Sequence, residues 1–126
     1  MPQEKFLWVI RLALSKEKLV MIVDVLGTWY TITKSDKVKD NELNHSDGYC
    51  DYSTKQIVID TFQDSPGSLA DLEKYRKQVI RHELIHAFLY ESGLSANSWG
   101  ANEEIVDWIA CQFPKMVEVF ERVGAS

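Results

Sequence analysis

The motif His82-Glu83-Leu84-Ile85-His86 places three ionisable side chains in the most apolar stretch of the chain. Unpaired polar groups in apolar surroundings cost several kcal/mol each, so these side chains require partners. On an α-helix, residues four apart are separated by about 40° around the axis, and His82 and His86 therefore project from one face. Two imidazole nitrogens that converge on one point suit a divalent metal ion, and zinc in particular.

The residues around this motif carry the end signals of a long helix. Ser68 is a suitable N-cap residue and Gly93 is a suitable C′ residue. Apolar residues lie on one side of the first half and nearly all round the second half, as expected of a helix that runs into the core. We expect a second helix over Asn102–Phe113, ended by the proline that follows, and a third over Pro114–Val123.

Strand-like segments precede these helices. They are the β-branched and aromatic runs Val20–Val23, Trp29–Thr33, Tyr49–Tyr52 and Gln56–Asp60. Gly27-Thr28 has the chemistry of a hairpin turn between the first two runs, and Tyr49–Tyr52 can pair back on Gln56–Asp60. We interpret Lys34–Gly48 as a loop, and residues 1–18 as either a helix or an extended arm. Because the strand-like segments precede the helices, the sequence predicts an α+β fold. We expect a small antiparallel or mixed β-sheet packed on the motif helix and on a second, ligand-bearing helix.

Length, charge and cysteine usage exclude several classes of protein. A chain of 126 residues predicts a single domain, 1–126, and its net charge of -5 argues against a nucleic-acid partner. Cys50 and Cys111 form no CxxC pair, so a reducing cytoplasm fits best, and we expect Cys111 to be a buried small residue. The apolar runs are too short to span a membrane, so no membrane partner is expected.

The second predicted helix offers the third protein ligand that a catalytic zinc usually takes. Glu103 borders the apolar stripe of this helix, whereas Glu104 points away from it. We therefore predict Glu103 as the ligand, in preference to His45, the one histidine outside the motif. Asp107, one turn after Glu103, is expected to accept the other N–H of a liganding imidazole. The alternative for Asp107 is a solvated acid on the helix surface.

Glu83 lies on the same side of the motif helix as His86, about 60° from it. There it can act as a general base toward a water molecule that the metal activates, without occupying a coordination position. The alternative interpretation is that two histidines and a glutamate share the helix by chance, as core or rim residues. The apolar surroundings disfavour this alternative, because desolvated ionisable groups need compensation.

The motif, followed by Asn102-Glu103 and Asp107, resembles the zincin metallopeptidases of the gluzincin type. Residues 48–52 and Ile57–Ile59 are similar to the strand before the active-site helix in compact ImmA/IrrE-type peptidases of bacteria and their phages or other mobile elements. The resemblance covers about residues 48–113. It implies a minimal zincin-like fold whose edge strand binds an extended peptide above the metal. It also implies that His82, His86 and Glu103 bind Zn²⁺, that Glu83 is general base and then acid, and that Asp107 supports a histidine.

The chain departs from the larger gluzincins in one respect. Those enzymes place an additional histidine or tyrosine downstream to stabilise the oxyanion, and this chain has neither residue after Tyr90. Tyr49, Tyr52, Tyr90 and His45 are candidates from other elements, although packing or surface exposure also accounts for each of them. The sequence alone does not determine which of these residues would stabilise the oxyanion.

The leading hypothesis is a zinc-dependent endopeptidase, in which the metal activates water and Glu83 transfers protons. The resemblance suggests a peptide or protein substrate, such as a cytoplasmic regulatory protein. The first alternative is a zincin-like interaction module that holds zinc structurally and has lost turnover. The second is a toxin or partner protein in which the motif is accidental and no stoichiometric metal binds. The sequence does not indicate an oligomeric state.

Overall fold

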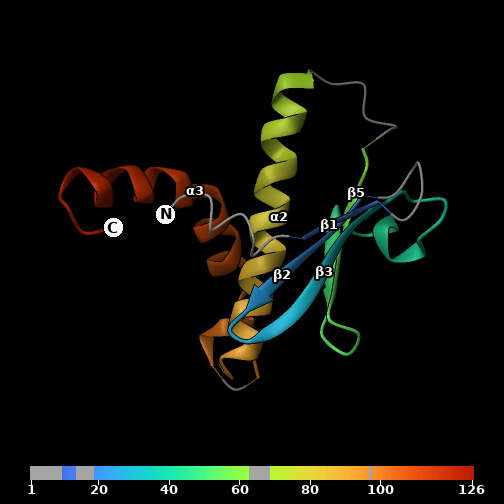
Figure 1. Cartoon of the computed structure of the whole chain (residues 1–126), viewed down its shortest axis with the longest axis horizontal. Helices are drawn as coiled ribbons and strands as arrows, with labels where there is room; N and C mark the ends of the chain where they lie inside the picture. Colours follow the sequence, from blue (N-terminus) through green and yellow to red (C-terminus); the bar gives the residue numbers. More distant parts are fainter. Residues whose placement is uncertain (1–9, 14–18, 63–68, 97) are drawn as a thin grey trace.

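The computed structural model describes residues 10–13, 19–62, 69–96 and 98–126. In chain order, the elements are β1 (Ile10–Ala13), β2 (Leu19–Val25), β3 (Thr28–Ser35), the 3-10 helix η1 (Asn41–Asn44), β4 (Gly48–Asp51), β5 (Gln56–Asp60), α2 (Leu69–Glu91), the 3-10 helix η2 (Trp99–Ala101) and α3 (Glu103–Arg122). All strands precede the two long helices. A sheet, α2 and α3 form successive layers (Figure 1), which confirms the predicted α+β class.

The strands form one mixed sheet in the order β1-β2-β3-β5-β4. β3 and β5 are parallel, and the other neighbours are antiparallel. The hairpin between β2 and β3 is confirmed, but its turn is Leu26-Gly27 rather than Gly27-Thr28. Both turn residues have positive φ, 52° and 93°, which is the backbone of a tight two-residue hairpin and favours glycine. The Gly27 N–H donates to Asp24 Oδ1 at 2.6 Å and fixes this turn.

The predicted pairing of residues 49–52 back on 56–60 is confirmed by the β4–β5 hairpin. Within the described part of the chain, β4 is the edge strand beside β5. Gly48 is buried, and a Cβ atom there would lie only 2.9 Å from Val79 Cγ1 on α2. The missing side chain therefore lets the edge strand approach the helix that carries the motif.

The hydrophobic core lies between the sheet and α2. Its buried members are Val25, Tyr30, Ile32, Ile57, Ile59, Phe62, Val79 and Ala87. At the end of α2, Gly93 has a φ of 83° and donates to Tyr90 O, while the Leu94 N–H donates to Leu89 O. This is the paired hydrogen bonding of a Schellman motif, so the predicted stop at Gly93 is confirmed. The predicted N-cap, Ser68, lies outside the described residues.

α3 runs without interruption past Pro114, so the predicted break and the separate third helix are wrong. A proline removes the N–H that would bond the carbonyl four residues earlier. Here that carbonyl belongs to Ala110, and Arg81 Nε on α2 donates to it at 2.8 Å. Because this tertiary hydrogen bond satisfies the carbonyl, the helix can continue through the proline.

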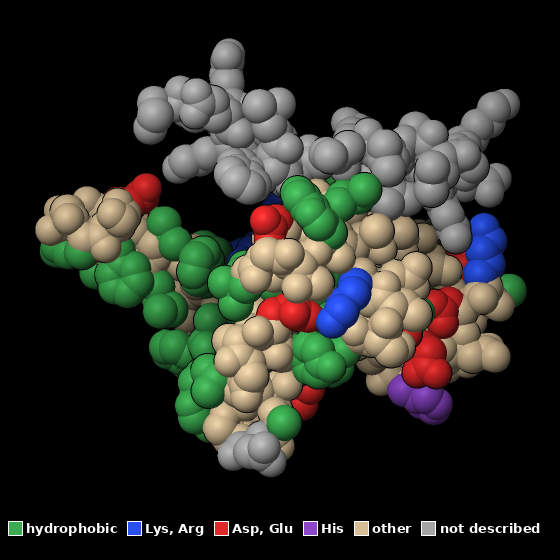
Figure 2. Space-filling model, turned by 60° about the horizontal axis from the view of Figure 1, so that its bottom comes forward, with side chains coloured by type: hydrophobic (Ala, Val, Ile, Leu, Met, Phe, Trp, Pro, Cys, Tyr) green, Lys and Arg blue, Asp and Glu red, His purple; other side chains and the backbone are tan. Residues whose placement is uncertain are grey.

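The C-terminal half of α3 extends away from α2 and the sheet (Figure 1). Apolar side chains gather on this arm, at the left of Figure 2, and they include Phe113, Phe120 and Val123, which are 46%, 44% and 70% exposed. Cys111 is exposed too, so its predicted burial is wrong. The neighbouring Ala110 takes the buried position on this turn instead.

Two further predictions concern the rest of the chain. Lys34–Gly48 contains the short η1 helix and the ends of two strands rather than loop alone. Of the two alternatives for residues 1–18, the extended one holds for β1, and residues 1–9 and 14–18 lie outside the described residues. None of the described helices is long and apolar enough to cross a membrane.

Glu91, the last residue of α2, ties the helix to the sheet. Its Oε2 accepts hydrogen bonds from the Tyr30 hydroxyl at 2.7 Å and from Lys55 Nζ at 2.9 Å, and its Oε1 accepts one from Thr28 Oγ1 at 3.0 Å. The bonds from Lys55 and Tyr30 lower the pKa of the Glu91 carboxyl group below its ordinary value. The ionised form is therefore the one that the folded chain stabilises.

We predict that Glu91→Gln lowers the urea midpoint of unfolding at pH 7. A carboxyl group with a lowered folded pKa contributes stability above its unfolded pKa of about 4.3 and loses it as the pH falls through the folded pKa. The difference between wild type and variant should therefore shrink below about pH 4. Glu118→Gln is the control, because Glu118 forms an exposed ion pair with Arg122 on its own helix. A difference that is constant between pH 3 and pH 7 would contradict this role of Glu91.

Candidate metal centre

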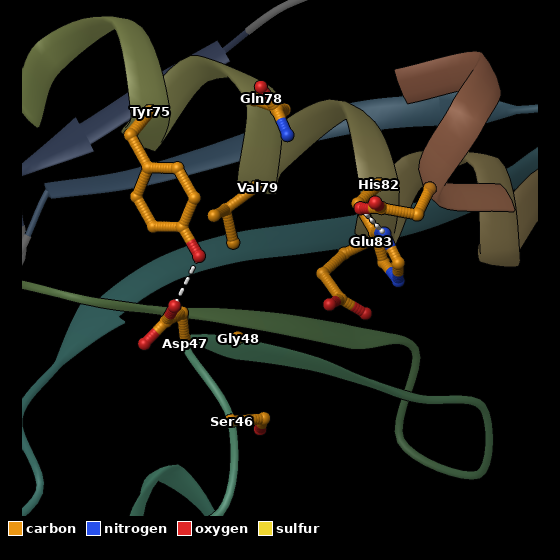
Figure 3. A pocket seen from close by; sticks show the side chains of 9 residues that line it. Ser46, Asp47, Gly48, Tyr75, Gln78, Val79, His82 and Glu83 are labelled. Carbon is orange, nitrogen blue, oxygen red and sulfur yellow. Dashed lines mark hydrogen bonds and ion pairs between the residues drawn. The ribbon is translucent and has the colours of Figure 1, made fainter. Parts of the chain in front are cut away.

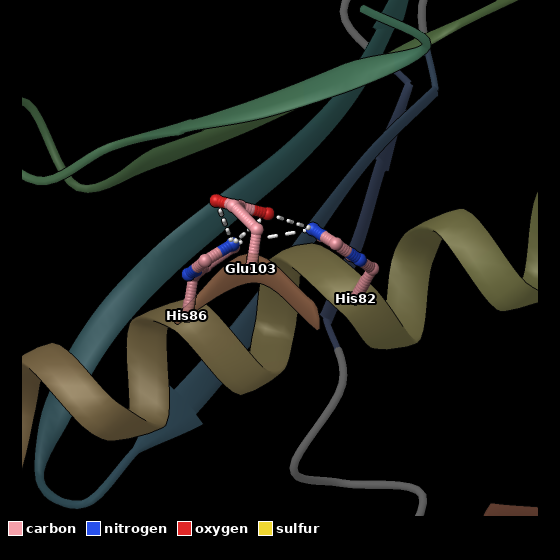
Figure 4. A group of neighbouring side chains, drawn as sticks. All are labelled: His82, His86 and Glu103. Carbon is pink, nitrogen blue, oxygen red and sulfur yellow. Dashed lines mark hydrogen bonds and ion pairs between the residues drawn. The ribbon is translucent and has the colours of Figure 1, made fainter. Parts of the chain in front are cut away.

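Helix α2 presents two histidines on one face, as the spacing predicts. The His82 and His86 Nε2 atoms are 3.2 Å apart, and the ring centroids are 4.8 Å apart. His86 is buried, with 8% of the residue exposed, and His82 is half-buried. Figure 4 shows the two rings directed toward one another from successive turns of the helix.

The first turn of α3 brings Glu103 to these nitrogens. Asn102 caps the helix by accepting the Ile105 N–H at 3.0 Å, so Glu103 is its first residue. Glu103 Oε1 lies 2.9 Å from His82 Nε2 and 3.1 Å from His86 Nε2. Figure 4 shows the carboxylate above the gap between the two rings. The structure thus brings together the three side chains that the sequence singled out.

This donor set fits a zinc ion. Two ligands about 2.0 to 2.1 Å from a tetrahedral ion lie about 3.3 Å from each other. The nitrogen–nitrogen and nitrogen–oxygen separations among His82, His86 and Glu103 are 2.9 to 3.2 Å, close to that value. His45, the alternative third ligand, lies on the exposed end of η1 and does not belong to this group.

Asp107 lies behind His82, as expected for a residue that orients an imidazole. Its Oδ1 is 3.3 Å from His82 Nδ1, the ring nitrogen that does not face Glu103. An acceptor at this nitrogen holds the proton on Nδ1 and leaves the Nε2 lone pair free. Glu104 is exposed and belongs to neither contact, as the helical spacing predicts.

Glu83 projects from α2 toward the strand that carries Gly48 (Figure 3). The residue is buried, with 7% of its surface exposed, and it is not one of the three grouped side chains. Burial raises the pKa of its carboxyl group to about 7, with His82 acting against this shift and Glu103 adding to it. A carboxyl group in this range can both accept and release a proton near neutral pH.

His82 and Glu83 lie where two cavities meet. Both cavities are also lined by Ser46 and Gly48. The first, of about 190 Å³, extends to Asp47, Tyr75 and Asp107, and the Tyr75 hydroxyl donates to Asp47 (Figure 3). The second, of about 320 Å³, extends along β4 to Tyr49, Cys50 and Tyr52 and includes His86 and Glu103. Together they form a groove beside the edge strand, which we call the β4 groove.

The described charged side chains that line the β4 groove are acidic apart from the histidines. They are Asp47, Glu83, Glu103 and Asp107. A third cavity continues past Tyr52 and adds Glu42 and Asp51. Because these side chains are carboxylates, the groove carries a negative potential that favours cationic groups. Cys50 faces the groove as a thiol, because burial and the nearby Glu83 raise its pKa to about 12.

The two tyrosines that line the second cavity differ in their contacts. The Tyr49 hydroxyl donates to Asp40 Oδ2 at 2.5 Å. The Tyr52 ring stacks on Tyr90, with centroids 4.3 Å apart and planes 3° from parallel. Burial raises the pKa of the Tyr52 hydroxyl to about 12, so it keeps its proton at neutral pH.

Our sequence interpretation did not identify Tyr75, Gln78 and Asp47 as part of the site. Tyr75 and Gln78 lie seven and four residues before His82, on the same face of α2. Both residues could have been identified by extending the helical periodicity of the motif toward the N-terminus. Asp47 gave no local signal, because its contact with Tyr75 spans 28 residues of sequence.

No family model, curated protein or solved structure matches the chain. The resemblance to zincins therefore rests on the motifs in the sequence, and we infer the function from the geometry of the site.

We predict that the chain binds one zinc ion and that His86→Ala and Glu103→Ala each weaken binding by more than about 100-fold, because each removes a ligand. Zinc affinity can be measured by competition with a chromophoric chelator. Glu104→Ala is the matched control, since it changes the neighbouring carboxylate and leaves the group intact. Absence of stoichiometric zinc, or unchanged affinity in Glu103→Ala, would show that these residues do not form the centre.

For Asp107, we predict a smaller effect. Asp107→Ala should weaken zinc binding about 10- to 100-fold and leave the stoichiometry at one, because it removes a partner of a ligand rather than a ligand. The same competition assay measures this change. Wild-type affinity in the variant would favour the alternative, in which Asp107 is a solvated helix acid.

Proposed function

We propose that this chain is a zinc-dependent endopeptidase of the zincin type, a single domain over residues 1–126. One observation carries the proposal: the buried Glu83 lines the same cavity as the group His82, His86 and Glu103, in a groove along a sheet edge. A metal-ligand group by itself would also suit a structural zinc site. The adjacent general base and the groove favour hydrolysis.

His82, His86 and Glu103 would hold Zn²⁺ through two nitrogens and one carboxylate. A zinc ion bound in this way lowers the pKa of water to about 7 and polarises a peptide carbonyl group. Asp107 orients the His82 ring through Nδ1. Three protein ligands would leave a coordination position for water or substrate. The Glu103 side chain is 70% exposed, so the group is open to solvent on the side of Glu103.

Glu83 would move the proton in the reaction. As general base it accepts a proton from the attacking water, and as general acid it delivers that proton to the nitrogen of the departing amine. Two features of the site support this role. The carboxyl group is buried where bulk water competes little for the proton, and it lies where both cavities of the groove meet.

The substrate would bind as an extended peptide beside β4. The strand has an unpaired edge among the described elements, and main-chain hydrogen bonds to such an edge give affinity with little dependence on sequence. The carboxylates of Asp47 and Asp107 at one end of the groove would favour lysine or arginine in the substrate. A peptide or protein substrate, including a regulatory protein, is consistent with this groove.

The free cysteines and the net charge of -5 support the related proposals of a cytoplasmic location and no nucleic-acid partner.

One observation favours a second function, a zincin-like zinc-binding module without turnover. The chain has no histidine or tyrosine after Tyr90 to stabilise an oxyanion in the way the larger gluzincins do.

We predict that Glu83→Gln keeps one bound zinc and lowers kcat by about 10²- to 10⁴-fold, because it removes the proton acceptor and preserves the side-chain shape. The assay uses the zinc-loaded protein and a quenched fluorescent peptide library that includes lysine- and arginine-containing sequences. Glu73→Gln is the control, since Glu73 is an exposed acid on the same helix that pairs with Arg76.

Two outcomes would contradict the peptidase. Full activity in Glu83→Gln excludes this mechanism. If the zinc-loaded wild type cleaves no peptide and chelation of zinc unfolds the chain, the non-catalytic module is the correct function.

A further inference from the structure

Hydrolysis of a peptide bond puts negative charge on the carbonyl oxygen, and a positioned hydrogen-bond donor lowers the barrier. If the proposed peptidase function holds, such a donor must lie close to His86 and Glu103. The sequence offers no histidine or tyrosine after Tyr90, so a histidine or tyrosine in this role has to come from an element before the end of α2. The structure distinguishes among the four candidates that the sequence left open.

Most tyrosine hydroxyls in the chain are already engaged. Of the five tyrosines, Tyr30 donates to Glu91, Tyr49 to Asp40 and Tyr75 to Asp47. A hydroxyl that donates its single proton to a carboxylate has none left for a substrate. His45 follows η1 as its C-cap residue and lines neither cavity of the β4 groove. These contacts leave Tyr52 and Tyr90.

Tyr52 and Tyr90 differ in where they lie. Tyr90 is one helical turn after His86 on α2, and it lines the outer cavity beyond Tyr52 but neither cavity of the β4 groove. Tyr52 follows β4 directly and lines the inner cavity together with His86, Glu83 and Glu103. The stack on Tyr90, with centroids 4.3 Å apart, holds the Tyr52 ring against the helix that carries the metal-ligand group.

The Tyr52 hydroxyl is available as a donor. It makes no hydrogen bond with any other residue that the structure describes, in contrast to Tyr30, Tyr49 and Tyr75. A phenol keeps its proton at neutral pH, and a stacked ring loses little conformational freedom when it donates. A donor that is fixed before the reaction stabilises developing charge without reorganisation.

We infer that Tyr52, at the start of the turn between β4 and β5, donates a hydrogen bond to the scissile carbonyl oxygen as it becomes negatively charged. The donor would thus come from the substrate-binding edge of the sheet, upstream of the motif helix. This inference rests on the proposed peptidase function. It assigns a catalytic role to the hydroxyl group of Tyr52, whose ring stacks on Tyr90.

The test compares Tyr52→Phe with wild type on a peptide selected from the library. The variant keeps the ring and the stack, so KM and zinc affinity should stay within about twofold, while kcat falls about 10²- to 10³-fold. Binding of a phosphonate analogue of the same peptide, which resembles the charged intermediate, should weaken by a similar factor. Tyr90→Phe is the matched control and should keep wild-type kcat, because it preserves the stack and removes a hydroxyl that does not line the inner cavity.

Each other result overturns the inference in a distinguishable way. If Tyr52→Phe cleaves at the wild-type rate while Glu83→Gln does not, Tyr52 is not the donor and the peptidase function stands. Equal losses in Tyr52→Phe and Tyr90→Phe, or loss of zinc in Tyr52→Phe, would indicate a structural role of the stack. If zinc-loaded wild type cleaves nothing, the peptidase function and the donor role both fail.

Discussion

Helix α2 packs against the sheet on one side and α3 on another, and the candidate site depends on this double contact. Val79 and Ala87 belong to the core beneath the sheet. His82 and His86 meet Glu103 at the start of α3. Removal of either neighbour would break up the site, because the histidines come from one layer and the carboxylate from the next. The hydrogen bond from Arg81 to Ala110 O holds these two layers together at a second point.

Local spacing in the sequence predicted much of the fold and the grouping of the candidate ligands. Helical periodicity placed His82 and His86 on one face and separated Glu103 from Glu104, because both predictions depend only on the geometry of a single helix. The strands β2 to β5 and the stop at Gly93 followed from equally local chemistry, whereas β1 was left open between a helix and an extended arm. The turn at Leu26-Gly27 differed from the prediction by one residue, which is the ordinary uncertainty of element boundaries.

Contacts between distant residues account for what the sequence did not predict. The helix passes through Pro114 because Arg81, on another helix, satisfies the freed carbonyl group. Tyr75 meets Asp47, and Tyr52 meets Tyr90, across the space between the sheet and α2. No periodicity within one element encodes such pairs. The exposure of Cys111 likewise depends on which side of α3 packs against a neighbour.

The lack of a side chain at Gly48 fixes the gap between β4 and α2. Any Cβ atom there would meet Val79, Ile59 and the Val58 carbonyl oxygen at 2.9 to 3.1 Å. The clearance between the edge strand β4 and the helix that carries the candidate ligands is therefore set by the size of a single hydrogen atom. A chain that gained even a methyl group at this position would have to shift Val79 or move β4 away from α2. Fold stability and the width of the β4 groove therefore share one determinant.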